Sequence, residues 1–177
     1  PEFEVLDGPL ELGGVFVDAR ERGVVVFLTR DVEELLRVAH AGAARNNDVL
    51  IPFGSVDPRT GAEAIQGAKR QAIDLGARGF KFHPSLQGFD PSSEQFYPLW
   101  ETLQELGLPA IFHTGQNGMG AGLPGGYGIK LGYSNPLLLD AVAADFPGLQ
   151  IIMAHPSVPW QDEAISSATH ESNVFID

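Results

Sequence analysis

The sequence contains no cysteine, which excludes disulfide bonds and thiolate metal sites. Any metal must therefore be bound by histidine, aspartate or glutamate. Long apolar runs are also missing, since no stretch approaches the roughly 20 residues that span a bilayer. The first residues carry neither a basic region nor an apolar stretch, so they do not resemble a signal peptide. We therefore expect a cytoplasmic protein that does not insert into a membrane.

Positive charge is scarce, because 11 lysines and arginines face 23 aspartates and glutamates, for a formal net charge of −12. An acidic surface repels phosphate backbones and anionic lipid headgroups, which disfavours nucleic acid and membranes as partners. A local basic pocket can still bind an anionic small molecule, so a small-molecule substrate is the expected partner. The 177 residues, 44% of them hydrophobic, suffice for a single domain, 1–177, with one core.

Short apolar, β-branched segments alternate with amphipathic ones along most of the chain. The apolar segments predict strands at 24–29, 49–56, 79–82, 109–113, 149–155 and 173–177. Amphipathic spacing predicts helices at 31–45, 62–75 and 96–106, after 135 and after 160. The segment 11–22 is interpreted as a weak helix, within a weakly ordered or helical lead-in at 1–23. Apolar strands separated by helices predict a parallel sheet that helices cover on its faces.

Polar residues at the ends of consecutive predicted strands favour a barrel over a doubly wound sheet. In a barrel these carboxyl ends converge on one mouth, where catalytic groups gather. No Gly-x-Gly-x-x-Gly phosphate turn follows the first predicted strand, which also disfavours the doubly wound alternative. Six strands are visible and a closed barrel of this type has eight. We therefore expect an α/β fold of the (β/α)8 TIM-barrel type that is incomplete, with strands two to seven present and the first and eighth missing.

Two histidines end successive predicted strands, His113 and His155. An imidazole at a barrel mouth can bind a divalent metal or transfer protons near neutral pH. The alternative is a structural histidine that caps its strand by bonding a loop carbonyl. Two equivalent positions are harder to explain structurally, because each buried imidazole needs its own partners.

Lys81 and His83 flank Phe82 at the end of another predicted strand, so both side chains can point to the mouth. Lys81 can pair with a substrate carboxylate or, as a carbamate, bridge two metals, and His83 is a candidate substrate-binding residue. The alternative for Lys81 is a side chain that reaches solvent past the strand end. Asp177, at the end of the last predicted strand, is expected to be an acceptor outside the ligand shell.

A glycine-rich loop follows His113 and predicts either a mobile cover over the substrate or a close backbone approach to a ligand. Thr114 and Asn117 in this loop are candidate substrate-binding residues. Trp160 either lines the pocket or attaches the next helix to the barrel. The remaining histidines, His40 and His170, fall within predicted helices and are expected to face solvent.

Five short motifs in this order and spacing resemble the amidohydrolase-related family that includes aminocarboxymuconate-semialdehyde decarboxylase and the resorcylate-type decarboxylases. The motifs are Phe53-Gly54-Ser55-Val56-Asp57-Pro58, Gly79-Phe80-Lys81-Phe82-His83-Pro84, Phe112-His113-Thr114-Gly115, Tyr133-Ser134-Asn135-Pro136 and Ala154-His155-Pro156-Ser157. The resemblance implies a (β/α)8 barrel with a divalent metal, usually zinc or manganese. It also implies that His113 is a metal ligand and that His155 is the acid/base. The family's His-x-His pair on the first strand and its aspartate on the eighth have no counterpart in this sequence.

The expected activity is that of a metal-dependent hydrolase or non-oxidative decarboxylase. Its substrate would be a small carboxylate-bearing or cyclic molecule, with Lys81 and His155 as catalytic residues. Two alternatives remain at this point: a metal-free sugar-phosphate barrel enzyme, and a non-catalytic partial barrel that serves as a binding or assembly module. Because barrels of this type often pair, a homodimer is one expected form.

Overall fold

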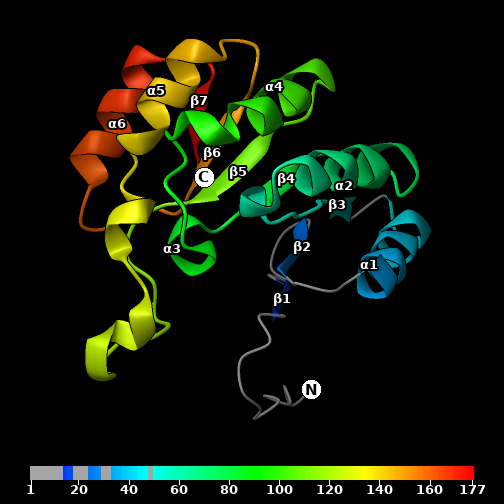
Figure 1. Cartoon of the computed structure of the whole chain (residues 1–177), viewed down its shortest axis with the longest axis horizontal. Coiled ribbons are helices and arrows are strands. Elements are labelled where there is room, and N and C mark those ends of the chain that lie inside the picture. The colour runs from blue at the N-terminus through cyan, green and yellow to red at the C-terminus, as the bar shows by residue number, and fades with distance from the viewer. Residues whose placement is uncertain (1–13, 18–23, 29–32, 48–49) are drawn as a thin grey trace.

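The strands form two sheets, one of three strands and one of four, and in each sheet the strands are ordered as in the chain (Figure 1). The computed structural model describes residues 14–17, 24–28, 33–47 and 50–177. The parallel strands are β2 (Val24–Leu28), β3 (Ile51–Pro52), β4 (Phe80–Phe82), β5 (Ala110–His113), β6 (Ile151–Ala154) and β7 (Val174–Ile176). Parallel bridges pair β2 with β3 and join β4 to β7 in sequence, and a further bridge from Gly54 to Phe80 connects the two sheets. This order is that of consecutive barrel strands, and it confirms the predicted α/β architecture.

Helices follow the strands as the sequence predicts. They are α1 (Glu33–Arg45), α2 (Ala62–Ile73), α4 (Tyr97–Glu105), α5 (Leu138–Asp145) and α6 (Gln161–His170). A short helix that the sequence analysis missed, α3 (Pro84–Gln87), begins directly after β4. Proline at its first position and left-handed Gly88 after its end explain why it is a single turn. Its importance is that it places Ser85 and Gln87 beside His83.

The interpretation of 11–22 as a weak helix is wrong for its described residues. Gly14–Val17 forms strand β1, which pairs antiparallel with β2. Valine and phenylalanine favour an extended backbone, and the hydrogen bonds offered by the neighbouring strand decide between the two structures. The rest of the expected lead-in, 1–13 and 18–23, lies outside the described residues.

The core on the helical side of β4–β7 is built around aromatic rings. Trp100 is completely buried and lies 5.1 Å from the Phe82 ring and 5.3 Å from the Phe112 ring, in edge-on contact with both. Its indole Nε1 donates to the Pro91 carbonyl at 3.0 Å. Phe82 and Phe112 directly precede His83 and His113, so this aromatic core fixes the strand ends that carry the two histidines.

His40 is buried, which corrects the expectation that it faces solvent. It is 4% exposed and lies three residues before buried Ala43, so both residues are on the same face of α1. Burial lowers the pKa of His40 below its ordinary 6.5, and the backbone of Leu75 partly offsets this effect. His170, in contrast, lies at the exposed end of α6, as predicted.

His40 should make the protein less stable in acid. The unfolded state takes up a proton near the ordinary pKa of 6.5, and the folded state takes it up only at lower pH. The contribution is therefore complete above pH 6.5 and is lost as the pH falls below it. Urea unfolding at pH 7.5 and pH 5 should show a smaller loss of unfolding free energy for His40→Leu than for the wild type. His170→Leu is the exposed control and should keep the wild-type difference; an equal loss in all three proteins would contradict the assignment.

In the described part of the chain, no helix has the length and apolar character needed to cross a membrane.

Candidate active site

The carboxyl ends of β4, β5 and β6 bring three histidines together. Phe82 pairs with Phe112, and His113 pairs with Ala154, so His83, His113 and His155 stand at neighbouring positions along one edge. The rings of His83 and His113 stack, with centroids 3.9 Å apart and planes 16° from parallel. The His155 ring lies 5.2 Å from that of His113 in an edge-on arrangement. The predicted convergence of these residues at one mouth is therefore present in the structure.

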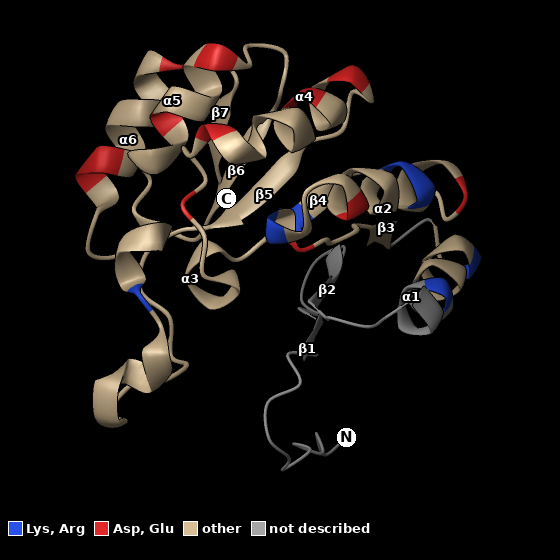
Figure 2. Ribbon diagram, viewed as in Figure 1, with Lys and Arg blue, Asp and Glu red and all other residues tan. Residues whose placement is uncertain are grey.

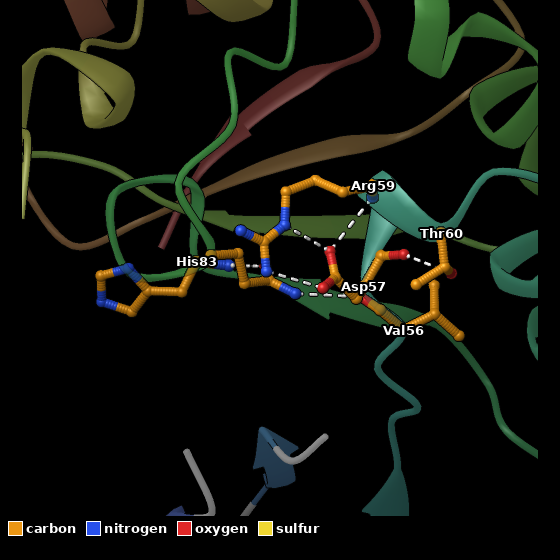
Figure 3. Close-up of polar contacts among 6 residues, drawn as sticks. Val56, Asp57, Arg59, Thr60 and His83 are labelled. Atoms are coloured by element: carbon orange, nitrogen blue, oxygen red, sulfur yellow. Dashed lines mark hydrogen bonds and ion pairs between the residues drawn. The ribbon is translucent and has the colours of Figure 1, made fainter. Parts of the chain in front are cut away.

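His83 is held at its backbone by a glutamine from α3. The His83 amide donates to Gln87 Oε1 at 2.7 Å, and Gln87 Nε2 donates to the Val56 carbonyl at 2.9 Å. Next to Val56, the Asp57 carboxylate accepts two side-chain hydrogen bonds from Arg59, at 2.9 and 2.7 Å (Figure 3). This turn after β3 therefore anchors the turn after β4 through Gln87.

The site keeps the imidazoles of His83 and His113 neutral. Burial, together with the smaller effects of His113, Lys81 and His155, lowers the pKa of His83 to about 2. Burial likewise lowers the pKa of His113 to about 4, again with Lys81 and His155 contributing. Uncharged rings can stack closely and have a lone pair available for a metal or a donor. At neutral pH both rings are therefore unprotonated.

Lys81 lies in the middle strand position of β4 and is half-buried. Burial lowers its pKa to about 8, and the exposed Asp177 carboxylate raises it in opposition. Helices α4, α5 and α6 carry acidic residues and no lysine or arginine, whereas α1 and α2 carry lysine or arginine (Figure 2). Lys81 is therefore a cation within the sheet, charged at neutral pH but closer to losing its proton than an exposed lysine.

Thr114 joins two loops in the structure. Its hydroxyl donates to the Ala154 carbonyl at 3.1 Å and shares a 2.7 Å hydrogen bond with Ser157 Oγ. Gly115 comes so close to this second loop that a Cβ atom there would lie 2.7 Å from the Ser157 carbonyl carbon, and its φ of 89° also favours glycine. Thr114 and Gly115 thus fix the loop after β5 against the loop that carries His155.

His155 stands at the open side of the site. Its side chain is exposed, and its backbone is left-handed with φ of 78°. Trp160 is half-buried and its amide donates to the Ser157 carbonyl at 2.6 Å immediately before α6. This backbone contact tests neither interpretation of the Trp160 side chain, so both stay predictions.

The loop after β5 continues into a projecting segment, 116–133, which we call the arm (Figure 1). Asn117 lies at its start, and Ser134 directly follows its end. Both bond the hydroxyl of Ser85 in α3, with Ser134 Oγ donating at 2.8 Å and Asn117 Nδ2 at 3.4 Å. Neither Ser85 nor Ser134 was predicted as a site residue from the sequence. The sequence does contain a signal for Ser85, because His83-Pro84-Ser85 repeats the pattern His155-Pro156-Ser157.

The described residues can supply one donor to a metal site. Neutral imidazole is the form that binds divalent metals, and His113 provides one such donor. His113 Nε2 lies 3.2 Å from the Gln116 carbonyl oxygen, which leaves its other ring nitrogen without such a contact. No group of three histidine, aspartate or glutamate side chains in the described ranges is placed to hold an ion. A complete ligand set would therefore need donors beyond these residues.

Several solved structures share this fold. An uncharacterised TIM-barrel protein from Bordetella bronchiseptica is 26% identical with a TM-score of 0.69, over 88% of this chain and 53% of that one. A 5-carboxyvanillate decarboxylase from Novosphingobium aromaticivorans, solved with bound manganese, is 23% identical with a TM-score of 0.57, over 76% and 41%. The 4-oxalomesaconate hydratase from Rhodopseudomonas palustris is 18% identical with a TM-score of 0.55, over 80% and 47%. The chain thus spans about half the length of these structures.

None of the curated proteins matches the chain. The model of the amidohydrolase family, in contrast, matches residues 5–177, nearly the whole sequence. This match agrees with the parallel strand order and with the histidines at the ends of β5 and β6. The chain therefore belongs to the amidohydrolase family.

Proposed function

We propose that the protein is a divalent-metal-dependent hydrolase or non-oxidative decarboxylase that acts on a small carboxylate-bearing substrate. The observation that carries this proposal is the meeting of three imidazoles at the carboxyl ends of β4, β5 and β6, close to Lys81 within β4. A cation and neutral nitrogen ligands at one mouth are suited to a negatively charged substrate and a metal.

Each side chain has a separate role in this proposal. His113 contributes one metal ligand, and the other ligands come from outside the described residues. A bound divalent metal would polarise a substrate carbonyl or activate water. Lys81 binds the substrate carboxylate, because it is charged at neutral pH and its burial strengthens an ion pair. His155, exposed at the open side, accepts or donates the proton during attack or at the carbon that loses CO₂.

The solved relatives support the carboxylate and the metal. Structures of 2,6-dihydroxybenzoate decarboxylase, 5-carboxyvanillate decarboxylase and 4-oxalomesaconate hydratase all match this fold. The compound in each of these enzyme names is a carboxylate. Manganese is present in two of the decarboxylase structures. We propose manganese or zinc for this protein, and the family match favours this enzyme over the metal-free sugar-phosphate barrel.

The proposal predicts metal binding that depends on His113. After incubation with manganese or zinc and gel filtration, elemental mass spectrometry should find close to one metal per wild-type chain. His113→Ala should bind at least roughly tenfold less, because one ligand is lost. The exposed-helix variant His170→Ala is the control and should keep its metal. Equal metal in wild type and His113→Ala would remove His113 from the ligand set, and no metal in any protein would contradict metal dependence of this chain.

Turnover is the second part of the test. Hydroxybenzoates, unsaturated dicarboxylates and lactones are incubated with the metal-loaded protein, and CO₂ release and ring opening are followed separately. CO₂ from a carboxylate supports the decarboxylase, and ring opening supports the hydrolase. If only uncharged esters or amides reacted, the proposed carboxylate class would be wrong.

A further inference from the structure

The Ser85 hydroxyl is a junction between His83 and the arm. Ser85 and Ser134 are almost completely buried, at 3% and 1% exposure. Ser85 Oγ accepts hydrogen bonds from Ser134 Oγ and Asn117 Nδ2, and it lies 3.4 Å from His83 Nδ1. A hydroxyl has one proton to donate. With two donors already directed at its oxygen, the Ser85 proton is left for His83 Nδ1.

We infer that Ser85 is a positioning residue that holds His83 with its proton on Nε2, so that this imidazole offers an N–H donor to a substrate oxygen. In a neutral histidine one ring nitrogen donates and the other accepts, and the hydrogen bond made by one sets the role of the other. Ser85 Oγ is the hydrogen-bond partner of Nδ1, and no described residue forms a hydrogen bond with Nε2. His83 is therefore a hydrogen-bonding residue of the site and not a metal ligand through Nδ1.

The ring has little freedom to take another orientation. One face of His83 stacks on His113 at 3.9 Å, and Gln87 fixes its backbone amide. Because the stacking and the backbone position are both fixed, the hydrogen bond to Ser85 turns the Nδ1 edge of the ring toward α3. The substrate must then approach from the Nε2 edge.

The same hydroxyl connects His83 to the arm at both ends. Asn117 lies at the start of the arm, Ser134 directly follows its end, and the Ser134 carbonyl also accepts from the Gly115 amide at 2.8 Å. A displacement of the arm would therefore change the hydrogen bonds of Ser85, as well as the contact between the Gln116 carbonyl and His113 Nε2. We expect the arm to influence substrate binding through this contact. The inference about substrate rests on the proposed function, whereas the tautomer of His83 does not.

The tautomer can be measured without turnover. In metal-free protein with ¹⁵N-labelled histidine, long-range ¹H–¹⁵N spectra at pH 7.5 distinguish the protonated from the unprotonated ring nitrogen, and His83→Gln identifies the His83 signals. We expect the proton on Nε2. Ser85→Ala should move the Nδ1 resonance toward that of a nitrogen without a hydrogen bond, and Ser85→Thr, which keeps the hydroxyl, should restore it. A wild-type proton on Nδ1, or an unchanged Nδ1 resonance in Ser85→Ala, would overturn the inference.

Two further variants separate this role from general packing. Ser167 is an equally buried serine in α6 whose hydroxyl has no partner among the described residues, so Ser167→Ala should leave the His83 signals unchanged. Ser134→Ala keeps the Ser85 hydroxyl but removes its strongest donor, and it should shift Nδ1 in the same direction as Ser85→Ala but less. Ser134→Ala also replaces Ser85→Ala as the test variant if Ser85→Ala does not fold. If the His83 Nδ1 resonance moved as far in Ser167→Ala as in Ser85→Ala, loosened packing would explain both changes and the assignment would be refuted.

Kinetics test the link to substrate. With a carboxylate that turns over, Ser85→Ala should raise KM roughly tenfold and change kcat little, because a binding hydrogen bond is weakened in ground and transition state alike. A fall in kcat at constant KM would contradict a binding role for His83. If no carboxylate reacts while the tautomer result holds, the proposed function fails and the positioning of His83 by Ser85 stands.

Discussion

Replacement of His155 by asparagine is expected to lower turnover of the carboxylate substrate by roughly 100- to 10,000-fold, the usual contribution of a general acid or base. Asparagine cannot transfer the proton, but it tolerates the left-handed backbone that His155 adopts at φ of 78°. The side chain is exposed, so the change leaves no cavity. Steady-state rates and metal content, measured on the same preparation, would show lost turnover with metal retained.

Two controls make the His155 result specific. His170→Asn changes an exposed histidine on α6 and should keep the wild-type rate. His113→Ala should lose turnover together with metal, whereas His155→Asn should lose turnover alone. An undiminished rate in His155→Asn would remove His155 from the mechanism.

Replacement of Trp100 by alanine is expected to lower the free energy of unfolding by about 3–5 kcal/mol, as for other large aromatic residues in a core. Trp100 is completely buried and contacts the edges of Phe82 and Phe112. Its hydrogen bond to the Pro91 carbonyl would also be lost. Urea unfolding followed by circular dichroism gives the change directly.

The size of this effect depends on burial, so Trp160 is the matched control. Trp160 is half-buried, and Trp160→Ala should cost clearly less than Trp100→Ala. If Trp100→Ala does not fold, Trp100→Phe retains most of the ring and should give an intermediate loss. A loss below about 1 kcal/mol for Trp100→Ala would show that this aromatic cluster does not support the strands that carry His83 and His113.

The histidines show which features of the site can be predicted from the sequence and which cannot. That His113 and His155 end neighbouring strands follows from local patterns, because apolar runs and the helices between them repeat along the chain. That the His83 and His113 rings stack at 3.9 Å does not follow from any local pattern. It depends on the register between β4 and β5 and on the side-chain orientations that α3 imposes. The same holds for Ser85, whose partners are 32 and 49 residues away in the sequence.

Errors in the sequence-based predictions have the same origin. The segment at β1 has residues that suit a strand, but only pairing with β2 selects that structure over a helix. His40 is polar and lies in an amphipathic helix, and only the packing of α1 against β3 decides that this face is covered. In both cases a contact with another element determines the outcome.

The α/β class, the alternation of strands and helices, the family and the strand ends that carry the candidate site can all be predicted from the sequence. These properties follow from local hydrophobic periodicity, from residues that end helices and from short motifs. Only the tertiary structure decided which histidine rings touch, which hydroxyl sets the tautomer of His83 and how far burial lowers the pKa of Lys81 and His113. Hydrogen bonds and desolvation depend on distances between atoms that are far apart in the chain, and folding alone brings those atoms together.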